Sequence, residues 1–202
     1  MRLVLASASP RRADLLRAAG FTFDTLVVDV DERARPGEAP ADYVRRLAAE
    51  KSATAWRHLA PSAEASAEGG SSALLDLVVL GADTIVVIDG DILGKPRDDA
   101  EAGAMLRRLS GRRHEVMTGV SLRAKANERG LVEATGVYMV DIREEDVAWY
   151  VASGEGRDKA GAYAIQGLAA RFIPRIEGSY SNVVGLPVAA VAALLHELAS
   201  AG

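Results

Sequence analysis

The sequence predicts an α/β fold with a mixed sheet and flanking helices. Short apolar runs typical of buried strands alternate along the chain with longer segments of helical periodicity. Ile85–Ile88, followed by Asp89-Gly90 and Ile92-Leu93, is a hairpin pattern, so at least one strand pair is antiparallel. The 202 residues are 49% hydrophobic, enough to bury a sizeable core. We see no internal repeat and expect one domain over residues 1–202.

The first part of the chain is predicted to form a strand, a helix and a second strand. Arg2–Leu5 is a short apolar run. Ser9 as a cap and Pro10 in the first turn are typical of a helix start. Gly20 is a plausible helix stop, and we expect the second strand over Phe21–Val28.

A long helix is predicted to begin near Pro40. Its core face is an apolar stripe at helical spacing, made of Tyr43, Val44, Leu47, Ala48, Ala55, Trp56 and Leu59. The following segment, Pro61–Ala73, has almost no large apolar residue and two adjacent glycines. We therefore expect a flexible surface loop without function there.

The middle of the chain is predicted to begin with a buried strand, Leu77–Leu80, that ends at Gly81-Ala82-Asp83-Thr84 ahead of the hairpin. Two capping boxes follow, and each is expected to open a helix. They are Asp98 with Glu101, in a helix closed by Gly111, and Asp141 with Glu144, in a helix that ends at Gly154. The remaining elements are strands over Glu115–Arg123 and Leu131–Val140 and a last helix after Leu186-Pro187.

Composition excludes several classes of protein. The 24 Lys and Arg against 28 Asp and Glu give a formal net charge of -4, which argues against a mainly electrostatic nucleic-acid binder. The absence of cysteine excludes disulfides, thiolate metal sites and a cysteine nucleophile. No apolar stretch is long enough to span a membrane, and the first residues lack the apolar core of a secretory signal. We therefore expect a cytoplasmic protein.

Ser7-Ala8-Ser9-Pro10-Arg11-Arg12 lies between a predicted strand and a helix start, where free backbone N–H groups and the helix dipole favour an anion. Arg11 and Arg12 could grip phosphate oxygens there. The alternative is an ordinary capped helix with two solvated arginines.

Three further charged residues are candidates for the site. Lys51 falls inside the apolar stripe of its helix, which suits a ligand contact or a lysine that extends its ammonium to water. Asp83 follows an apolar strand, and Lys95 stands across the hairpin in Gly94-Lys95-Pro96. Asp83 could bind a hard cation or activate water and Lys95 could neutralise phosphate, unless they are only a turn aspartate and an exposed lysine.

Two more polar segments are candidates. Asp158–Gly167 mixes small, charged and amide residues and is too polar for plain core, and its Gln166 suits the edge of a base. Asp29, Asp31 and Glu32 form an acidic cluster that could complete a metal site or could be a solvated loop. The three histidines lack zinc-type spacing, and no Gly-x-Ser-x-Gly elbow indicates a serine hydrolase.

Taken together, these stretches resemble the Maf family, also called septum formation inhibitor Maf. The segments that carry the resemblance occur in family order over nearly the full chain: Leu5–Arg12, Glu50-Lys51, Gly81–Thr84, Gly94–Pro96, Leu109–Gly111 and Asp158–Tyr163. The resemblance implies the mixed α/β fold of inosine triphosphate pyrophosphatase-like enzymes, with two lobes around a cleft. It also implies nucleotide pyrophosphohydrolysis with Mg²⁺ or Mn²⁺.

The resemblance assigns roles to individual residues. Asp83 would be the proton acceptor, and Glu32 with Asp83 would be the metal carboxylates, although Asp31 lies beside Glu32. The triphosphate contacts would be Ser7, Arg11, Arg12, Lys51 and Lys95, while Lys159, Thr84 and Gln166 would complete the substrate site.

Within the family, Arg11, Thr84 and Gln166 match the branch that hydrolyses dTTP and UTP to the monophosphate and pyrophosphate. The 7-methyl-GTP branch has Trp, Gln and Glu at these positions. The competing function is a nucleotide-binding regulator of cell division without significant turnover, and a carboxylate at Asp83 favours the enzyme because a pure sensor has no use for it. The resemblance leaves a homodimer open.

Overall fold

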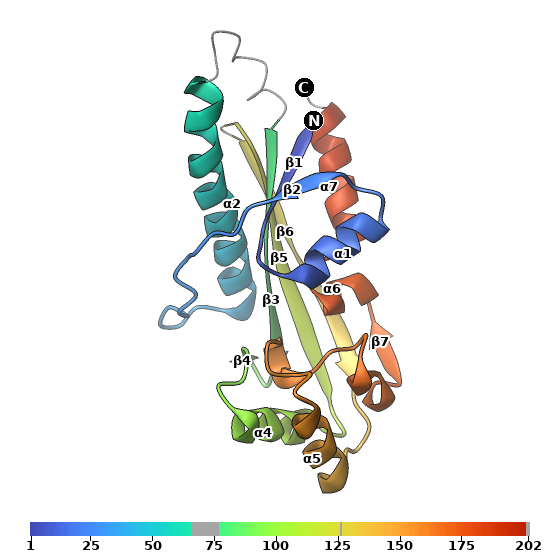
Figure 1. The fold of residues 1–202 in the computed structure, drawn as a ribbon. Helices are drawn as coiled ribbons and strands as arrows, with labels where there is room; N and C mark the ends of the chain where they lie inside the picture. The colour runs from blue at the N-terminus through green and yellow to red at the C-terminus, as the bar shows by residue number, and fades with distance from the viewer. Residues whose placement is uncertain (66–76, 126, 201–202) are drawn as a thin grey trace. The chain divides into compact units, whose positions relative to one another are not determined.

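The computed structural model describes residues 1–65, 77–125 and 127–200 (Figure 1). The elements in chain order are β1 (Arg2–Ala6), α1 (Pro10–Ala18), β2 (Phe23–Thr25), α2 (Pro40–Ala65), β3 (Leu77–Ile88), β4 (Asp91–Leu93), α4 (Asp99–Leu109), β5 (Arg113–Ala124), β6 (Asn127–Tyr138), α5 (Glu144–Ser153), the 3-10 helices η1 (Ala160–Ala162) and η2 (Leu168–Phe172), β7 (Arg175–Glu177), α6 (Tyr180–Val184) and α7 (Val188–Ser200).

The strands form a mixed sheet, as predicted. Among the described residues it has seven strands in the order β2-β1-β3-β5-β6-β7, with β4 paired to β3 outside this path. β1 runs parallel to both β2 and β3, whereas the β3–β4 and β6–β7 pairs are antiparallel. The β3–β4 connection is the predicted hairpin, and Asp89 and Gly90 both have positive φ there, as a tight two-residue turn requires.

The chain divides into two compact units. The first unit comprises Met1–Asp83, Thr118–Glu133 and Gly185–Gly202, and the second comprises Thr84–Met117 and Ala134–Val184. β3 contributes residues to both, and the boundary falls between Asp83 and Thr84.

In the first unit, the two faces of the strands bury different side chains because successive residues of a strand point to opposite faces. Leu3 and Leu5 of β1, with Val78 and Leu80 of β3, pack in one apolar cluster with α1 and α7. The opposite face has a second cluster, in which Val4, Ala6, Leu77 and Val79 pack with Ala55, Trp56 and Leu59 of α2. Figure 1 shows α2 on one side of these strands and α1 with α7 on the other.

The second unit has its own core. Residues of β3 and β4 pack there with the apolar faces of α4 and α5 and with the segment around η1 and η2. The largest of these side chains are Leu106, Leu109, Tyr150, Tyr163 and Phe172. Asp98 caps α4 by accepting a hydrogen bond from the Glu101 N–H at 2.8 Å, so the first predicted capping box is confirmed at that bond.

The predicted break in the middle strand was wrong. β3 runs without interruption through Gly81-Ala82-Asp83-Thr84, and all but Thr84 of its residues are buried. Gly81 does not form a turn; it allows a helix to approach, since a Cβ at this position would lie 2.2 Å from the carbonyl oxygen of Ala48 in α2. The structural reason for this glycine is packing between elements far apart in sequence.

Other boundaries also differ from the prediction. α5 is capped at Arg143 rather than at Asp141, with Glu144, Glu145 and Asp146 in its first turn, where the helix dipole favours acidic side chains. The strand expected over residues 21–28 is limited to β2. α2 continues to Ala65, so the predicted 61–73 loop begins with helical residues, and its residues 66–73 lie outside the described part of the chain.

Candidate active site

The predicted site residues divide between the two units. Ser7, Arg11, Arg12, Glu32, Lys51 and Asp83 belong to the first unit, and Thr84, Lys95, Lys159 and Gln166 belong to the second. We describe the two sets in turn.

Lys51 joins two of the predicted acidic residues. Its Nζ lies 2.6 Å from Asp83 Oδ1 and 2.7 Å from Glu32 Oε1. Lys51 and Asp83 are buried, with side chains 11% exposed, whereas the Glu32 side chain is 52% exposed. A buried ion pair is maintained only when its partners are held in place, because either charge alone would be costly to bury. Lys51 is therefore a buried member of an ion-paired cluster with Asp83 and Glu32, and its ammonium group does not extend into solvent.

The sheet geometry explains how Asp83 reaches α2. Residues 77, 79, 81 and 83 of β3 share one face, and Leu77 and Val79 pack on α2. Lys51 lies in the apolar stripe of α2, where Val44, Leu47, Ala48 and Ala55 are all buried. Both residues thus point into the same helix–sheet interface, and they meet there.

Two glycines bring α2 close to the sheet. A Cβ at Gly81 would lie 2.2 Å from Ala48 O, and one at Gly119 of β5 would lie 2.1 Å from Val44 O. No side chain fits in either place. The backbone of α2 therefore rests directly on two neighbouring strands, at about one and two turns before Lys51.

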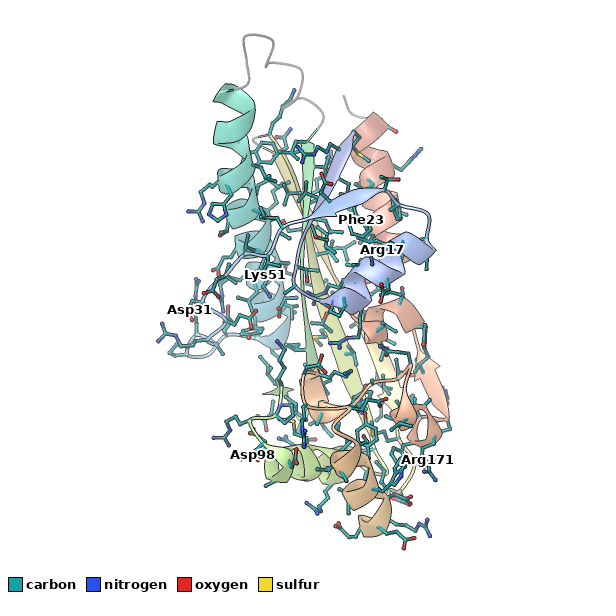
Figure 2. All side chains as sticks on the ribbon, viewed as in Figure 1. Arg17, Phe23, Asp31, Lys51, Asp98 and Arg171 are labelled. Carbon is teal, nitrogen blue, oxygen red and sulfur yellow. The ribbon has the colours of Figure 1, made fainter. Side chains whose placement is uncertain are left out.

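The three acidic residues of the loop before α2 have different surroundings. The Asp31 carboxylate accepts from Arg33 Nε at 2.8 Å and Nη2 at 2.6 Å, and this bonding holds the pKa of Asp31 well below its ordinary value. Asp29 is exposed. Glu32, and not Asp31, is the residue that contacts Lys51. Figure 2 shows Asp31 on this loop and Lys51 on α2.

The N-terminus of α1 is the predicted anion site, and its cap and first turn bear on that prediction. Ser9 occupies the cap position, but its side chain makes no capping hydrogen bond, and the first turn contains no acidic residue. Ser7 Oγ accepts from the Ser9 N–H at 3.1 Å and from Arg12 Nη1 at 3.2 Å. With both acceptor positions of the hydroxyl engaged, its proton is left to donate, which suits a phosphate oxygen.

Arg12 connects this helix start to the rest of the first unit. Its side chain is buried and donates from Nε to Gly185 O at 2.8 Å and from Nη1 to Ala82 O at 2.9 Å. Burial lowers the pKa of Arg12, and the Asp83 carboxylate opposes that shift. Arg12 thus links α1 to the backbone beside Asp83 through bonds that the sequence did not indicate.

The predicted residues of the second unit are half-buried or exposed, and Thr84 and Lys159 are the half-buried ones. Lys95 and Gln166 are on the surface, and Lys159 Nζ donates to Glu155 O at 2.6 Å and lies 2.5 Å from Asp158 Oδ1. The Gly161 N–H donates to Gly94 O at 3.0 Å, so the two predicted motifs of this unit touch.

The segment Asp158–Gly167 was expected to be too polar for core, and this was wrong for its centre. Ala162, Tyr163 and Ile165 are buried members of the apolar cluster. The positive φ of Gly161 and Ala162 sharply turns the backbone there, so that polar and apolar neighbours can point in opposite directions.

Sequence reasoning missed three residues that hold the loop before α2. The Tyr43 hydroxyl donates to Glu32 O at 2.7 Å, and Arg46 Nη2 donates to Arg33 O at 3.2 Å. Arg46 also pairs with Glu38. From the sequence, Tyr43 was assigned only to the core face of its helix. The polar groups along the stripe that contains Lys51 are the sequence feature that could have indicated these residues.

Glu32 and Asp83 are the residues predicted to hold a divalent cation. No group of three or more His, Cys, Asp and Glu residues that could hold a metal ion occurs in the described part of the chain. Glu32 and Asp83 nevertheless converge on one ammonium group, so their carboxylates are already arranged around a positive charge. Mg²⁺ is commonly bound by one or two carboxylates together with substrate phosphates, and this pair fits that pattern.

Comparison with known proteins identifies the family of this chain. A family model described as Maf-like protein matches residues 2–198. The chain belongs to the Maf family. Curated relatives named dTTP/UTP pyrophosphatase include one from Anaeromyxobacter dehalogenans (strain 2CP-C), 50% identical and covering 96% of this chain and 93% of its own. Another, from Vibrio cholerae, is 46% identical and covers 97% of each chain.

One solved structure, the Ham1 protein of Staphylococcus aureus, aligns over 70% of this chain and 73% of its own, with 14% identity and a TM-score of 0.41. That similarity is too low to carry an argument, and the fold rests on the mixed sheet itself. Among the described residues, no helix has the length and apolar character needed to cross a membrane.

Proposed function

We propose that this Maf-family protein is a nucleoside triphosphate pyrophosphatase that hydrolyses dTTP and UTP to the monophosphate and pyrophosphate. The observation that carries the proposal is the buried Asp83 carboxylate, held by Lys51 and linked through Ala82 and Arg12 to the start of α1. The printed names of the relatives at 46–50% identity support the choice of substrate.

Asp83 is assigned as the proton acceptor. Its Oδ1 accepts a hydrogen bond from Lys51 Nζ. We therefore assign the second carboxylate oxygen, Oδ2, as the acceptor of a proton from the water molecule that attacks the α-phosphorus. Lys51 keeps the carboxylate oriented. The leaving group is pyrophosphate.

The phosphates are assigned to the first-unit cations and to the start of α1. Ser7 would donate its hydroxyl proton, and the first N–H groups of α1 would face a phosphate oxygen. Lys95 and Lys159 would add positive charge, while Thr84 and Gln166 would contact the base. Charge stabilisation should be the main catalytic contribution, as in phosphoryl transfer generally.

We assign a bound Mg²⁺ or Mn²⁺ to Glu32 and Asp83. When bound, such an ion would neutralise charge on the phosphate oxygens and polarise the phosphorus. Cytoplasmic placement is part of the proposal, because the substrates are nucleotides of that compartment.

The test is a nucleotide panel with the products identified directly, using wild type and Asp83→Asn. Asparagine is nearly isosteric, so the variant should fold, yet it lacks the base and should lose almost all hydrolysis. Wild type should convert dTTP to dTMP and pyrophosphate. A folded Asp83→Asn protein with near-wild-type turnover would refute the role of Asp83, and tight dTTP binding without turnover in wild type would favour the regulator instead.

A further inference from the structure

The loop between β2 and α2, residues 26–39, contains no helix or strand yet carries Glu32. The Glu32 side chain is 52% exposed where it meets Lys51. An ion pair with one exposed partner contributes little, because water screens it and ordering the side chains costs entropy. Bonds from α2 to the loop backbone also hold it.

The loop is fixed by its backbone at two consecutive residues. The Tyr43 hydroxyl donates to Glu32 O at 2.7 Å, and Arg46 Nη2 donates to Arg33 O at 3.2 Å. Tyr43 and Arg46 are three residues apart on α2, so they lie on the same side of the helix. They hold the carbonyls of the two peptides that directly follow the Glu32 Cα, which restrains the backbone from which the Glu32 side chain extends.

Arg46 is itself held firmly. Its Nε lies 2.6 Å from Glu38 Oε1 and its Nη2 lies 2.7 Å from Glu38 Oε2, a bidentate pair whose side chains are only 12% and 9% exposed. The pair lowers the pKa of Glu38 to about 2, so Glu38 is ionised at neutral pH. The guanidinium also lies over the Tyr43 ring, with Cζ 5.4 Å from its centroid.

The hydroxyl of Tyr43 remains a donor over the working pH range. Burial, together with the nearby Asp83 and Glu32 carboxylates, raises the pKa of Tyr43 to about 12. The phenol stays protonated at neutral pH, and its bond to Glu32 O persists.

We propose that Tyr43 and Arg46 are positioning residues that hold Glu32 in place beside Lys51 and Asp83, ready to bind the divalent ion. This inference rests on the proposed function for its consequence in catalysis, but the structural part can be tested without turnover. Removing either bond should make residues 29–35 more mobile and raise the metal-ion concentration needed for half activation. The core of the first unit should remain intact.

The experiment compares Tyr43→Phe with wild type by hydrogen exchange and by Mn²⁺ titration of dTTP hydrolysis. One lost hydrogen bond should make amide exchange over residues 29–35 about three- to tenfold faster and raise the Mn²⁺ concentration for half activation by a similar factor. Trypsin cleavage after Arg33 should accelerate in parallel. The matched control is Tyr138→Phe, whose hydroxyl bonds Glu177 Oε2 at 2.8 Å on the other unit and should change none of these values.

A second variant, Arg46→Lys, keeps the charge and removes the bidentate pair and the bond to Arg33. It should show the same exchange effect as Tyr43→Phe, or a larger one. Unchanged exchange over residues 29–35 in both variants would overturn the inference, as would unchanged Mn²⁺ half activation in an enzyme that turns over. Failure of wild type to release pyrophosphate would instead refute the proposed function, and the exchange result would still decide the positioning role.

Discussion

Replacing Gly81 with alanine should separate Lys51 from Asp83. The new Cβ would lie 2.2 Å from Ala48 O and 2.8 Å from Ser52 N, both backbone atoms of α2 that cannot swing aside. A carbon normally stays about 3.3 Å or more from a carbonyl oxygen, so α2 would have to withdraw locally by about 1 Å. The Lys51 Nζ to Asp83 Oδ1 distance, 2.6 Å in this structure, would then exceed hydrogen-bond range unless both side chains moved.

Two quantities should change. Overpacking of this kind costs about 1–3 kcal/mol, which should appear as a lower free energy of unfolding in urea. A misplacement of about 1 Å at a catalytic group can cost about a hundredfold in rate, so kcat/KM for dTTP should fall by that order even where the variant is fully folded. Activity should be measured well below the unfolding transition, so that the loss is not due to unfolded protein.

The matched control is Gly103→Ala in α4. A Cβ there would meet only the flexible end of Arg107 at 3.2 Å and Val147 Cγ1 at 3.8 Å, so activity should be retained. Gly119→Ala should resemble Gly81→Ala, because its Cβ would lie 2.1 Å from Val44 O of the same helix. A Gly81→Ala protein with wild-type stability and turnover would show that the close approach of α2 does not set the site.

Three further predictions concern the metal, the substrate and pH. EDTA should abolish dTTP hydrolysis and Mg²⁺ or Mn²⁺ should restore it, since a triphosphate facing two carboxylates would otherwise be repelled; full turnover in excess chelator would contradict this. dTTP and UTP should have clearly higher kcat/KM than ATP or GTP, and preference should move towards 7-methyl-GTP in the triple variant Arg11→Trp, Thr84→Gln, Gln166→Glu; unchanged ratios would argue that these three positions do not set the nucleotide preference. Burial lowers the pKa of His114 to about 4. The unfolded chain therefore takes up this proton first, and between pH 6.5 and 5 wild type should lose about 1.5 kcal/mol more stability than His114→Gln, as measured by urea unfolding at both pH values.

Much of the first-unit site was present in the sequence as two separate patterns. Lys51 falls in the apolar stripe of its helix, and Asp83 was expected directly after an apolar strand. The structure joins the two because β3 continues past Leu80 and carries Asp83 on the face that meets α2, and the predicted strand end at Leu80 concealed this link. The role of Gly81 could not be predicted, because a glycine needed for a close approach looks the same in sequence as a glycine needed for a turn.

The choice among the acidic residues of the 26–39 loop was beyond sequence reasoning. Asp29, Asp31 and Glu32 have similar chemistry, and an irregular loop has no periodicity from which to read side-chain direction. Their difference arises from donors far along the chain, since Tyr43 and Arg46 bind the carbonyls of Glu32 and Arg33. Asp31 instead pairs with its neighbour Arg33.

The cations that the sequence groups together as phosphate ligands differ in what already binds them. Arg12 is buried and bonded to the carbonyls of Ala82 and Gly185, and Lys51 is buried between two carboxylates, so both contribute to the frame of the first unit before any substrate arrives. Lys95 is exposed on the second unit. A buried cation bonded to protein acceptors is preorganised, and such fixed charges stabilise a transition state without reorganising during the reaction. Under the proposed function, Arg12 and Lys51 would therefore provide fixed positive charge around Asp83 before a triphosphate binds.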